Sequence, residues 1–71
     1  MDGRLRRMRL TEFWRRMDEV FGPSYAPSWA ADVALAELDG CTVQEALAHG
    51  VAAKKVWRAV CAQVEVPPHL T

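Results

Sequence analysis

The first strong pattern of hydrophobic positions lies at the start of the compact part of the chain, where apolar side chains recur every three or four residues. This spacing places them on one face of a helix that is predicted to begin at Thr11. Threonine is a residue type that caps helix N-termini, and Gly22 with Pro23 ends the pattern. The apolar positions of this predicted helix are Leu10, Phe13, Trp14, Met17, Val20 and Phe21.

A second helix is predicted to begin near Pro27 and to continue to Leu38. Proline lacks a backbone donor and suits the first turn of a helix but not its interior, so Tyr25 is expected in the preceding turn. Trp29 and the alanines that follow it favour helix and allow a neighbour to approach closely. Gly40 follows the last periodic residue, which is the usual place of a C-terminal cap.

The third and fourth helices carry the clearest signals. Thr42 and Glu45 have the spacing of a capping box, in which each side chain accepts a hydrogen bond from the backbone N–H of the other residue. The third helix is therefore predicted to begin at Thr42 and to end at Gly50. The fourth is predicted to run from Ala52 to Val64, with an inward stripe of Ala53, Val56, Trp57, Val60, Cys61 and Val64 and an outward set of Lys54, Lys55, Arg58 and Ala62.

No segment has the pattern of a strand, so these elements predict an all-α fold, a compact bundle of three to four short helices. Residues 1–9 hold four arginines and are expected to form a flexible basic N-terminal arm. Residues 10–66 form the single helical domain, and residues 67–71 are expected to be a C-terminal tail because Pro67 and Pro68 prevent the last helix from continuing.

The last two helices are predicted to form a helix-turn-helix-like arrangement. Ala46, Gly50, Val51 and Val56 have the residue types and spacing that the two helices of such a motif need in order to pack. On a DNA-reading helix, however, the groove face would hold only two side chains able to hydrogen-bond to a base or phosphate, Lys54 and Arg58. Trp57 falls on this face, and it is either part of the core, an anchor for a protein partner, or a stacking surface for nucleic acid.

Composition narrows the functional classes. The 71 residues carry nine basic and nine acidic side chains, so the chain lacks the positive excess of a protein that coats nucleic acid. No apolar run approaches the roughly 20 residues of a membrane span, and the protein is expected to be cytoplasmic. Cys41 and Cys61 are interpreted as small hydrophobic residues. Together with His49 and His69 they lack the close pairs of a zinc site, and no cofactor motif or catalytic constellation is present.

Several sequence blocks resemble a family of short actinobacterial proteins that is described as a domain of unknown function. The blocks are MRLTEFWRRM (residues 8–17), TVQEAL (42–47), AKKVWRAVC (53–61) and the pairs FG, SW, GV and VP between and after them. The resemblance covers Met8 to Pro67 and implies a cytoplasmic bacterial protein that starts at Met8. Genes of that family often lie near the gene of the recombinase RecA, which implies a link to DNA repair or recombination.

Two functions are consistent with the sequence. The first is a non-enzymatic protein-binding adaptor, for which zero net charge, small size and surplus tryptophan are the reasons. The alternative is a DNA-binding regulator that uses the basic face of the last helix and the N-terminal arm. A homodimer is also compatible with so small a domain. The candidate partner-binding residues are Trp14, Arg15, Arg16, Lys54, Lys55, Trp57 and Arg58.

Overall fold

The structure is a computed structural model of the 71-residue chain, and it describes residues 8–70. Within this range the chain is mostly helical and contains one small sheet. The α-helices are α2 (Leu10–Phe21), α3 (Ala26–Asp32), α4 (Val43–Ala48) and α5 (Ala53–Gln63). Two strands, β1 (Ala34–Leu35) and β2 (Cys41–Thr42), and two 3-10 turns, η1 (Ala36–Leu38) and η2 (Pro68–Leu70), complete the described fold.

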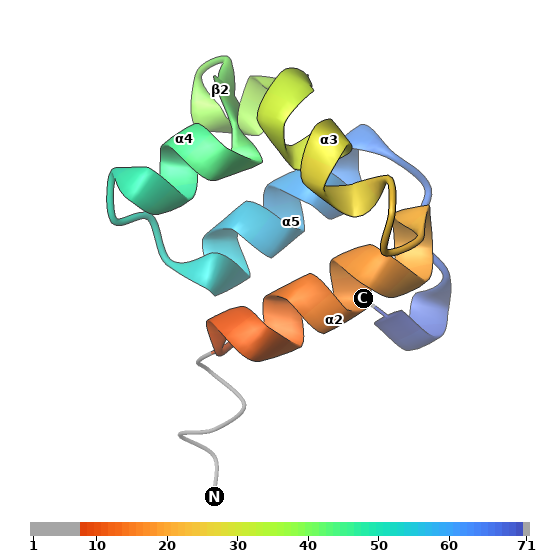
Figure 1. Ribbon diagram of the computed structural model, residues 1–71. Helices are drawn as coiled ribbons and strands as arrows, with labels where there is room; N and C mark the ends of the chain where they lie inside the picture. Colours follow the sequence, from red (N-terminus) through yellow and green to blue (C-terminus); the bar gives the residue numbers. More distant parts are fainter. Residues whose placement is uncertain (1–7, 71) are drawn as a thin grey trace, which may run out of the picture.

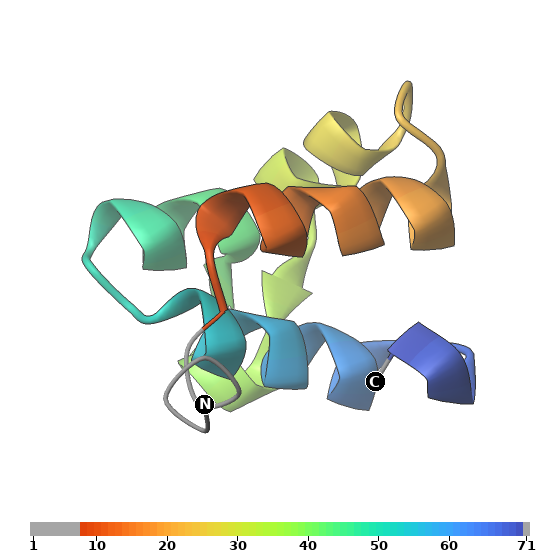
Figure 2. The same cartoon turned by 90° about the horizontal axis from the view of Figure 1, so that it is seen from below.

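The helices form two layers. Helices α2, α3 and α4 lie in front, and α5 lies behind them, as the two views show (Figures 1 and 2). Helices α2 and α5 run side by side in the same direction, so their N-terminal ends lie at the same end of the molecule (Figures 1 and 2). The short hairpin of β1 and β2 connects the layers at the side opposite α2 (Figure 1).

Aromatic rings join the two layers. Phe13 of α2 is fully buried and meets the indole of Trp57 of α5 edge to face, with ring centroids 6.0 Å apart. Met17, Val56 and Val60 are also fully buried in the same core. Edge-to-face pairs of this kind add about 0.5–1.5 kcal/mol beyond the apolar area that they bury. In so small a domain, this contact therefore matters more than it would in a large core.

Helix α2 begins one residue earlier than predicted, and its cap differs. Arg9, not Thr11, is the N-cap residue, and no side chain accepts a hydrogen bond from the first turn. The prediction of a threonine cap is wrong because Leu10 already belongs to the helix. The predicted end is confirmed. Gly22 has a φ of +90°, and its N–H donates to the backbone oxygen of Asp18 at 2.7 Å.

The second predicted helix is only half correct. Helix α3 does begin beside Pro27, with Tyr25 as its N-cap, but it ends at Asp32 rather than Leu38. The following residues form the antiparallel pair of β1 with β2, in which Ala34 faces Thr42 and Leu35 faces Cys41. The prediction that the chain has no strand is therefore wrong.

Packing explains why the helix stops there. Leu35 is fully buried between the exposed Ala34 and Ala36, an alternation that suits an extended segment, and Leu38 is buried from the 3-10 turn that follows. Asp39 and Gly40 have φ values of 58° and 85° and turn the chain back toward β2. Burial of the two leucines thus outweighs the helix propensity of the alanines, and Gly40 belongs to a hairpin turn instead of a helix cap.

Helices α4 and α5 agree with the sequence prediction. Thr42 forms the capping box with Glu45: the Glu45 N–H donates to Thr42 Oγ1 at 3.1 Å, and the Thr42 N–H donates to Glu45 Oε1 at 3.0 Å. Gly50 has a φ of +88°, which explains the glycine between the two helices. The inward stripe of α5 is correct in Val56, Trp57 and Val60, and it also includes Ala59, which the pattern missed.

The ends of the predicted domain are only partly described. Residues 1–7 of the expected basic arm lie outside the described residues, and Met8 packs against the core. In the expected C-terminal tail, Pro68 begins the turn η2. Within residues 8–70, none of the helices has the length and apolar character that crossing a bilayer requires.

Replacement of Trp57 tests the importance of the contact between layers. Trp57→Ala removes a side chain that is 2% exposed, and such a replacement in a core lowers the free energy of unfolding by about 3–5 kcal/mol. Tyr25 is 55% exposed, so Tyr25→Ala is the matched aromatic control and should cost about 0.5 kcal/mol. Urea denaturation followed by circular dichroism measures both. Equal midpoints for Trp57→Ala and the wild type would contradict this description of the core.

Candidate functional site

The seven predicted site residues fall on two surfaces. Trp14, Arg15 and Arg16 belong to α2, and Lys54, Lys55, Trp57 and Arg58 belong to α5. Of the two tryptophans, Trp57 is buried, so the interpretation of Trp57 as a partner anchor is wrong and the core interpretation is confirmed. The physical reason is its position in the inward stripe of α5, opposite Phe13.

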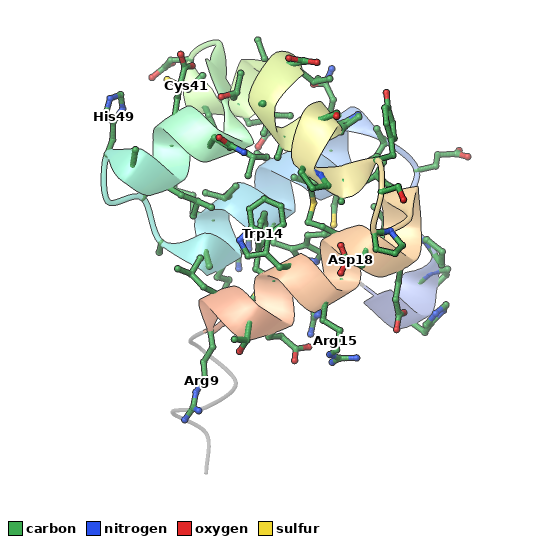
Figure 3. All side chains as sticks on the ribbon, in the orientation of Figure 1. Arg9, Trp14, Arg15, Asp18, Cys41 and His49 are labelled. Atoms are coloured by element: carbon green, nitrogen blue, oxygen red, sulfur yellow. The ribbon has the colours of Figure 1, made fainter. Side chains whose placement is uncertain are left out.

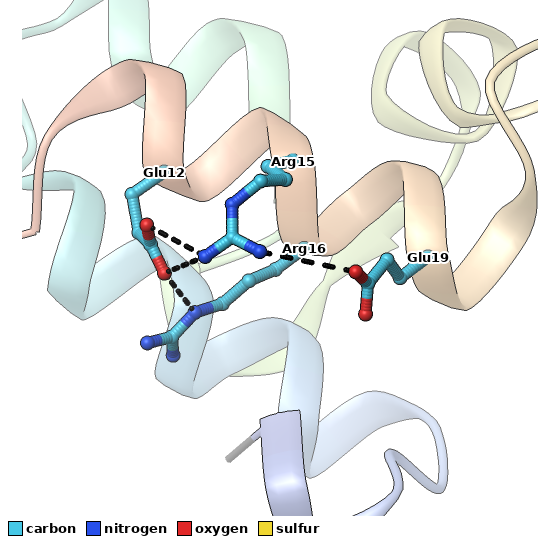
Figure 4. A network of polar contacts seen from close by, with 4 residues as sticks. All are labelled: Glu12, Arg15, Arg16 and Glu19. Carbon is cyan, nitrogen blue, oxygen red and sulfur yellow. Dashed lines mark hydrogen bonds and ion pairs between the residues drawn. The ribbon is translucent and has the colours of Figure 1, made fainter.

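The two arginines of α2 are held by carboxylates of their own helix (Figure 4). One guanidinium nitrogen of Arg15 donates to both carboxylate oxygens of Glu12, at 2.9 and 2.8 Å, and Arg16 Nε donates to Glu12 Oε2 at 2.9 Å. Arg15 also lies 3.8 Å from Glu19. These hydrogen bonds, that from Arg15 first, lower the pKa of Glu12 below its usual value, and the bond to Glu12 raises the pKa of Arg15.

Arg16 also belongs to the contact between α2 and α5. Its guanidinium carbon lies 5.8 Å from the ring centroid of Trp57, within the range of a cation–π interaction. Cys61, one turn further along α5, is partly buried, and this burial raises the pKa of its thiol while the charge of Arg16 opposes the rise. The geometry therefore gives Arg16 a structural role and leaves it a poor candidate for a partner contact.

Trp14 is the tryptophan that remains partly accessible. Its indole packs edge to face on Phe13, with centroids 5.2 Å apart, yet the side chain is only half-buried. Leu10, one turn earlier, is 53% exposed. Figure 3 shows Trp14 at the gap between α2 and α4, on the same side of α2 as Asp18, while Arg15 points away from this side. We call Leu10, Trp14 and Asp18 the Trp14 flank.

The cations of α5 form a second surface. Lys55 and Arg58 are exposed and Lys54 is half-buried, and none of the three side chains has an ion pair or hydrogen bond with a residue in the range 8–70. Lys55 also reaches a hollow of about 240 Å³ between η1, β2, α4 and α5. The other residues that line this hollow are Glu37, Leu38, Asp39, Cys41, Ala46, His49 and Val51.

Neither of two surface hollows shows the ligand set of a metal site. The hollow beside Lys55 contains a thiol, an imidazole and two carboxylates, but within the described residues no three histidine, cysteine or acidic side chains converge on a point where an ion would fit. A second, wide and open hollow lies along the end of α5 and the segment after it, from Cys61 to Pro68, and contains no histidine. Its single charged residue is Glu65.

Charge is divided unequally along the chain, although the net charge is zero. The segment 17–53 contains no lysine or arginine. It includes the whole of α3 and α4, so two of the three front helices have no cation. The acidic residues of this segment are Asp18, Glu19, Asp32, Glu37, Asp39 and Glu45. The charged residues of α3 and α4 are therefore all acidic.

Comparison with known proteins identifies the family. The sequence model of the family described as "Protein of unknown function (DUF3046)" matches residues 8–69, and the chain therefore belongs to this family. The match begins at Met8, as the resemblance of the sequence blocks implied, so residues 1–7 lie outside it. No curated protein and no solved structure matches the chain.

Glu12, Arg15, Arg16 and Glu19 form an ion network on α2, and the carboxylate of Glu12 at its centre predicts a pH effect on stability. The pKa of Glu12 is lower in the folded chain than in the unfolded chain, so the folded state binds fewer protons. Its contribution is fully present above the ordinary pKa of 4.5 and is lost as the pH falls through the lower, folded value. Melting temperatures of the wild type and Glu12→Gln should therefore differ at pH 6 and converge toward pH 3. A constant difference across this range would contradict the network.

Proposed function

We propose that this DUF3046 protein is a non-enzymatic adaptor that binds a protein partner through the Trp14 flank. The observation that carries the proposal is the half-buried indole of Trp14 beside Leu10, which is 53% exposed. Tryptophan is enriched among the residues that dominate binding energy at protein interfaces, because it contributes a large apolar area at a low cost in conformational entropy.

The ion network supports this choice of surface. Because Arg15 and Arg16 are paired with Glu12 on the other sides of α2, the helix presents Trp14 on a framework that is already ordered. A preordered surface loses less entropy on binding than a mobile one does. Arg15, which is exposed, remains a candidate for the rim of the interface.

The cellular setting is part of the proposal. The resemblance to actinobacterial proteins encoded near the recombinase RecA is the reason to propose DNA repair or recombination as the process, and the cytoplasm as the compartment. An adaptor in such a process joins proteins and needs no catalytic residues of its own.

The alternative function is DNA binding by α5. It is favoured by Lys54, Lys55 and Arg58, which have no ion pair with a described residue and follow one another on one helix. Helix α4, residues 49–52 and α5 supply the sequence pattern of a helix-turn-helix, and α4 contacts α5. With Trp57 in the core, the tryptophan is no longer an obstacle on the groove face.

Variants of the Trp14 flank test the adaptor. Full-length protein serves as bait in a lysate of the cells in which it is native, and captured proteins are quantified by mass spectrometry. We expect Trp14→Ala to lower capture of specific partners about tenfold or more, the loss that follows from a hot-spot residue. Leu10→Ser changes a mostly exposed side chain and should also lower capture without unfolding the domain.

The control for this experiment is Tyr25→Ala, which removes an exposed aromatic side chain at the N-cap of α3. It should leave capture unchanged. Equal capture by the wild type and both flank variants, each shown to be folded by circular dichroism, would refute the adaptor as stated.

Salt dependence tests the DNA alternative. Because phosphate contacts release counterions, binding to duplex DNA should weaken steeply between about 50 and 200 mM salt. Fluorescence anisotropy of a labelled duplex should show micromolar binding at the lower salt concentration, and the double variant Lys55→Ala with Arg58→Ala should abolish it. If no micromolar binding is found at about 50 mM salt, this function is excluded.

A further inference from the structure

We propose that the partner docked on the Trp14 flank is a cationic amphipathic segment, with apolar side chains against Leu10 and Trp14 and a lysine or arginine facing Asp18. This inference rests on the proposed adaptor function and adds the chemistry of the partner. It is carried by the side chain of Asp18, which has no ion pair within residues 8–70, and by the absence of cations from α3 and α4.

Asp18 is the first part of the argument. Its side chain is half-buried next to Trp14, and it has no hydrogen bond or ion pair with a residue in the range 8–70. It lies in the last turn of α2, where the helix dipole disfavours a carboxylate and where this helix has no basic residue. Glu19, in the same turn, is compensated by Arg15, but Asp18 is not. A cation from outside the described fold would supply the missing partner.

The neighbouring helices are the second part. Helix α3 has one charged residue, Asp32, and α4 has one, Glu45. Both are exposed. The helices α3 and α4 of the front layer therefore carry two further negative charges and no cation, while Arg15 and Arg16 lie on other sides of α2 and are paired with Glu12 (Figures 3 and 4). A positively charged partner is attracted to this face, and an acidic one is repelled.

The apolar part of the surface favours an amphipathic helix as the form of the segment. Leu10 and Trp14 are four residues apart on one helix, so a partner side chain that packs between them must be apolar. A helix with apolar residues at positions i, i+3, i+4 and i+7 and basic residues beside them fits such a surface.

Three synthetic helical peptides of equal length and equal leucine spacing test the inference, with lysine, glutamine or glutamate at the polar positions. Each is labelled with a dye, and its binding to the full-length protein is measured by fluorescence anisotropy. We expect the lysine peptide to bind most tightly and the glutamate peptide not to bind. Asp18→Asn should lower the affinity for the lysine peptide about threefold, as expected for the loss of one partly exposed charge pair. Trp14→Ala should lower this affinity about tenfold.

Two controls make the test specific. Glu65→Gln removes one negative charge outside the segment 17–53 and should leave the lysine peptide's affinity unchanged. Asp18→Asn removes an unfavourable charge at the helix end, so it should be at least as stable as the wild type, and a loss of binding then has no trivial cause in unfolding.

The outcomes separate this inference from the adaptor itself. If the glutamine peptide binds as tightly as the lysine peptide and both need Trp14, the docking surface stands and the cationic partner is refuted. If the lysine peptide binds equally well to Trp14→Ala, or no peptide binds, the inference is refuted, while the capture experiment still decides the adaptor. A homodimer in sedimentation that Leu10→Ser dissociates would replace the cationic segment with a second copy of the chain.

Discussion

The contact on which the structure depends is that between Phe13 and Trp57, because it holds the front layer of helices on α5. The indole of Trp57 is enclosed from two directions, by the edge-to-face ring of Phe13 and by the guanidinium of Arg16 at 5.8 Å. Arg16 is in turn oriented by Glu12, so an ion network at the surface and the aromatic core share one side chain. A domain this small has few such contacts, and the loss of one affects the whole fold.

This contact also decides which surfaces remain for function. The fold places Trp57 in the core, and it gives Arg16 a structural contact with the indole of Trp57. The other candidate residues lie on two helices. Trp14 belongs to α2 in the front layer, whose neighbours α3 and α4 have acidic residues only, and Lys55 and Arg58 belong to α5. A net charge of zero thus conceals an unequal distribution, since the segment 17–53 has no lysine or arginine and α5 has three basic and no acidic residues.

Most of the helical architecture was predictable because local chemistry determines it. The capping box of Thr42 and Glu45 and the stripe of α5 both depend on residues a few positions apart. The hairpin was not predictable, since strands of two residues are too short to show a period and the alanines around Leu35 equally favour helix. The role of Arg16 was also hidden, because it depends on a contact with Trp57, which is distant in sequence. The unequal distribution of charge, by contrast, was visible in the sequence despite the zero net charge, because the acidic residues of the middle of the chain follow the arginines of its N-terminal part.

Asp18 shows how stability and function separate in this domain. Local rules for a stable helix would place a lysine or arginine in the last turn of α2, and the chain has none there. The charge of Glu19 is compensated by an ion pair with Arg15. Asp18 is half-buried beside the accessible indole of Trp14 and has no ion pair among the described residues. A residue that lowers the stability of its helix and makes no compensating contact in the fold is best explained by a role in binding. The Trp14 flank is therefore a stronger candidate for a binding surface than the exposure of its side chains alone would indicate.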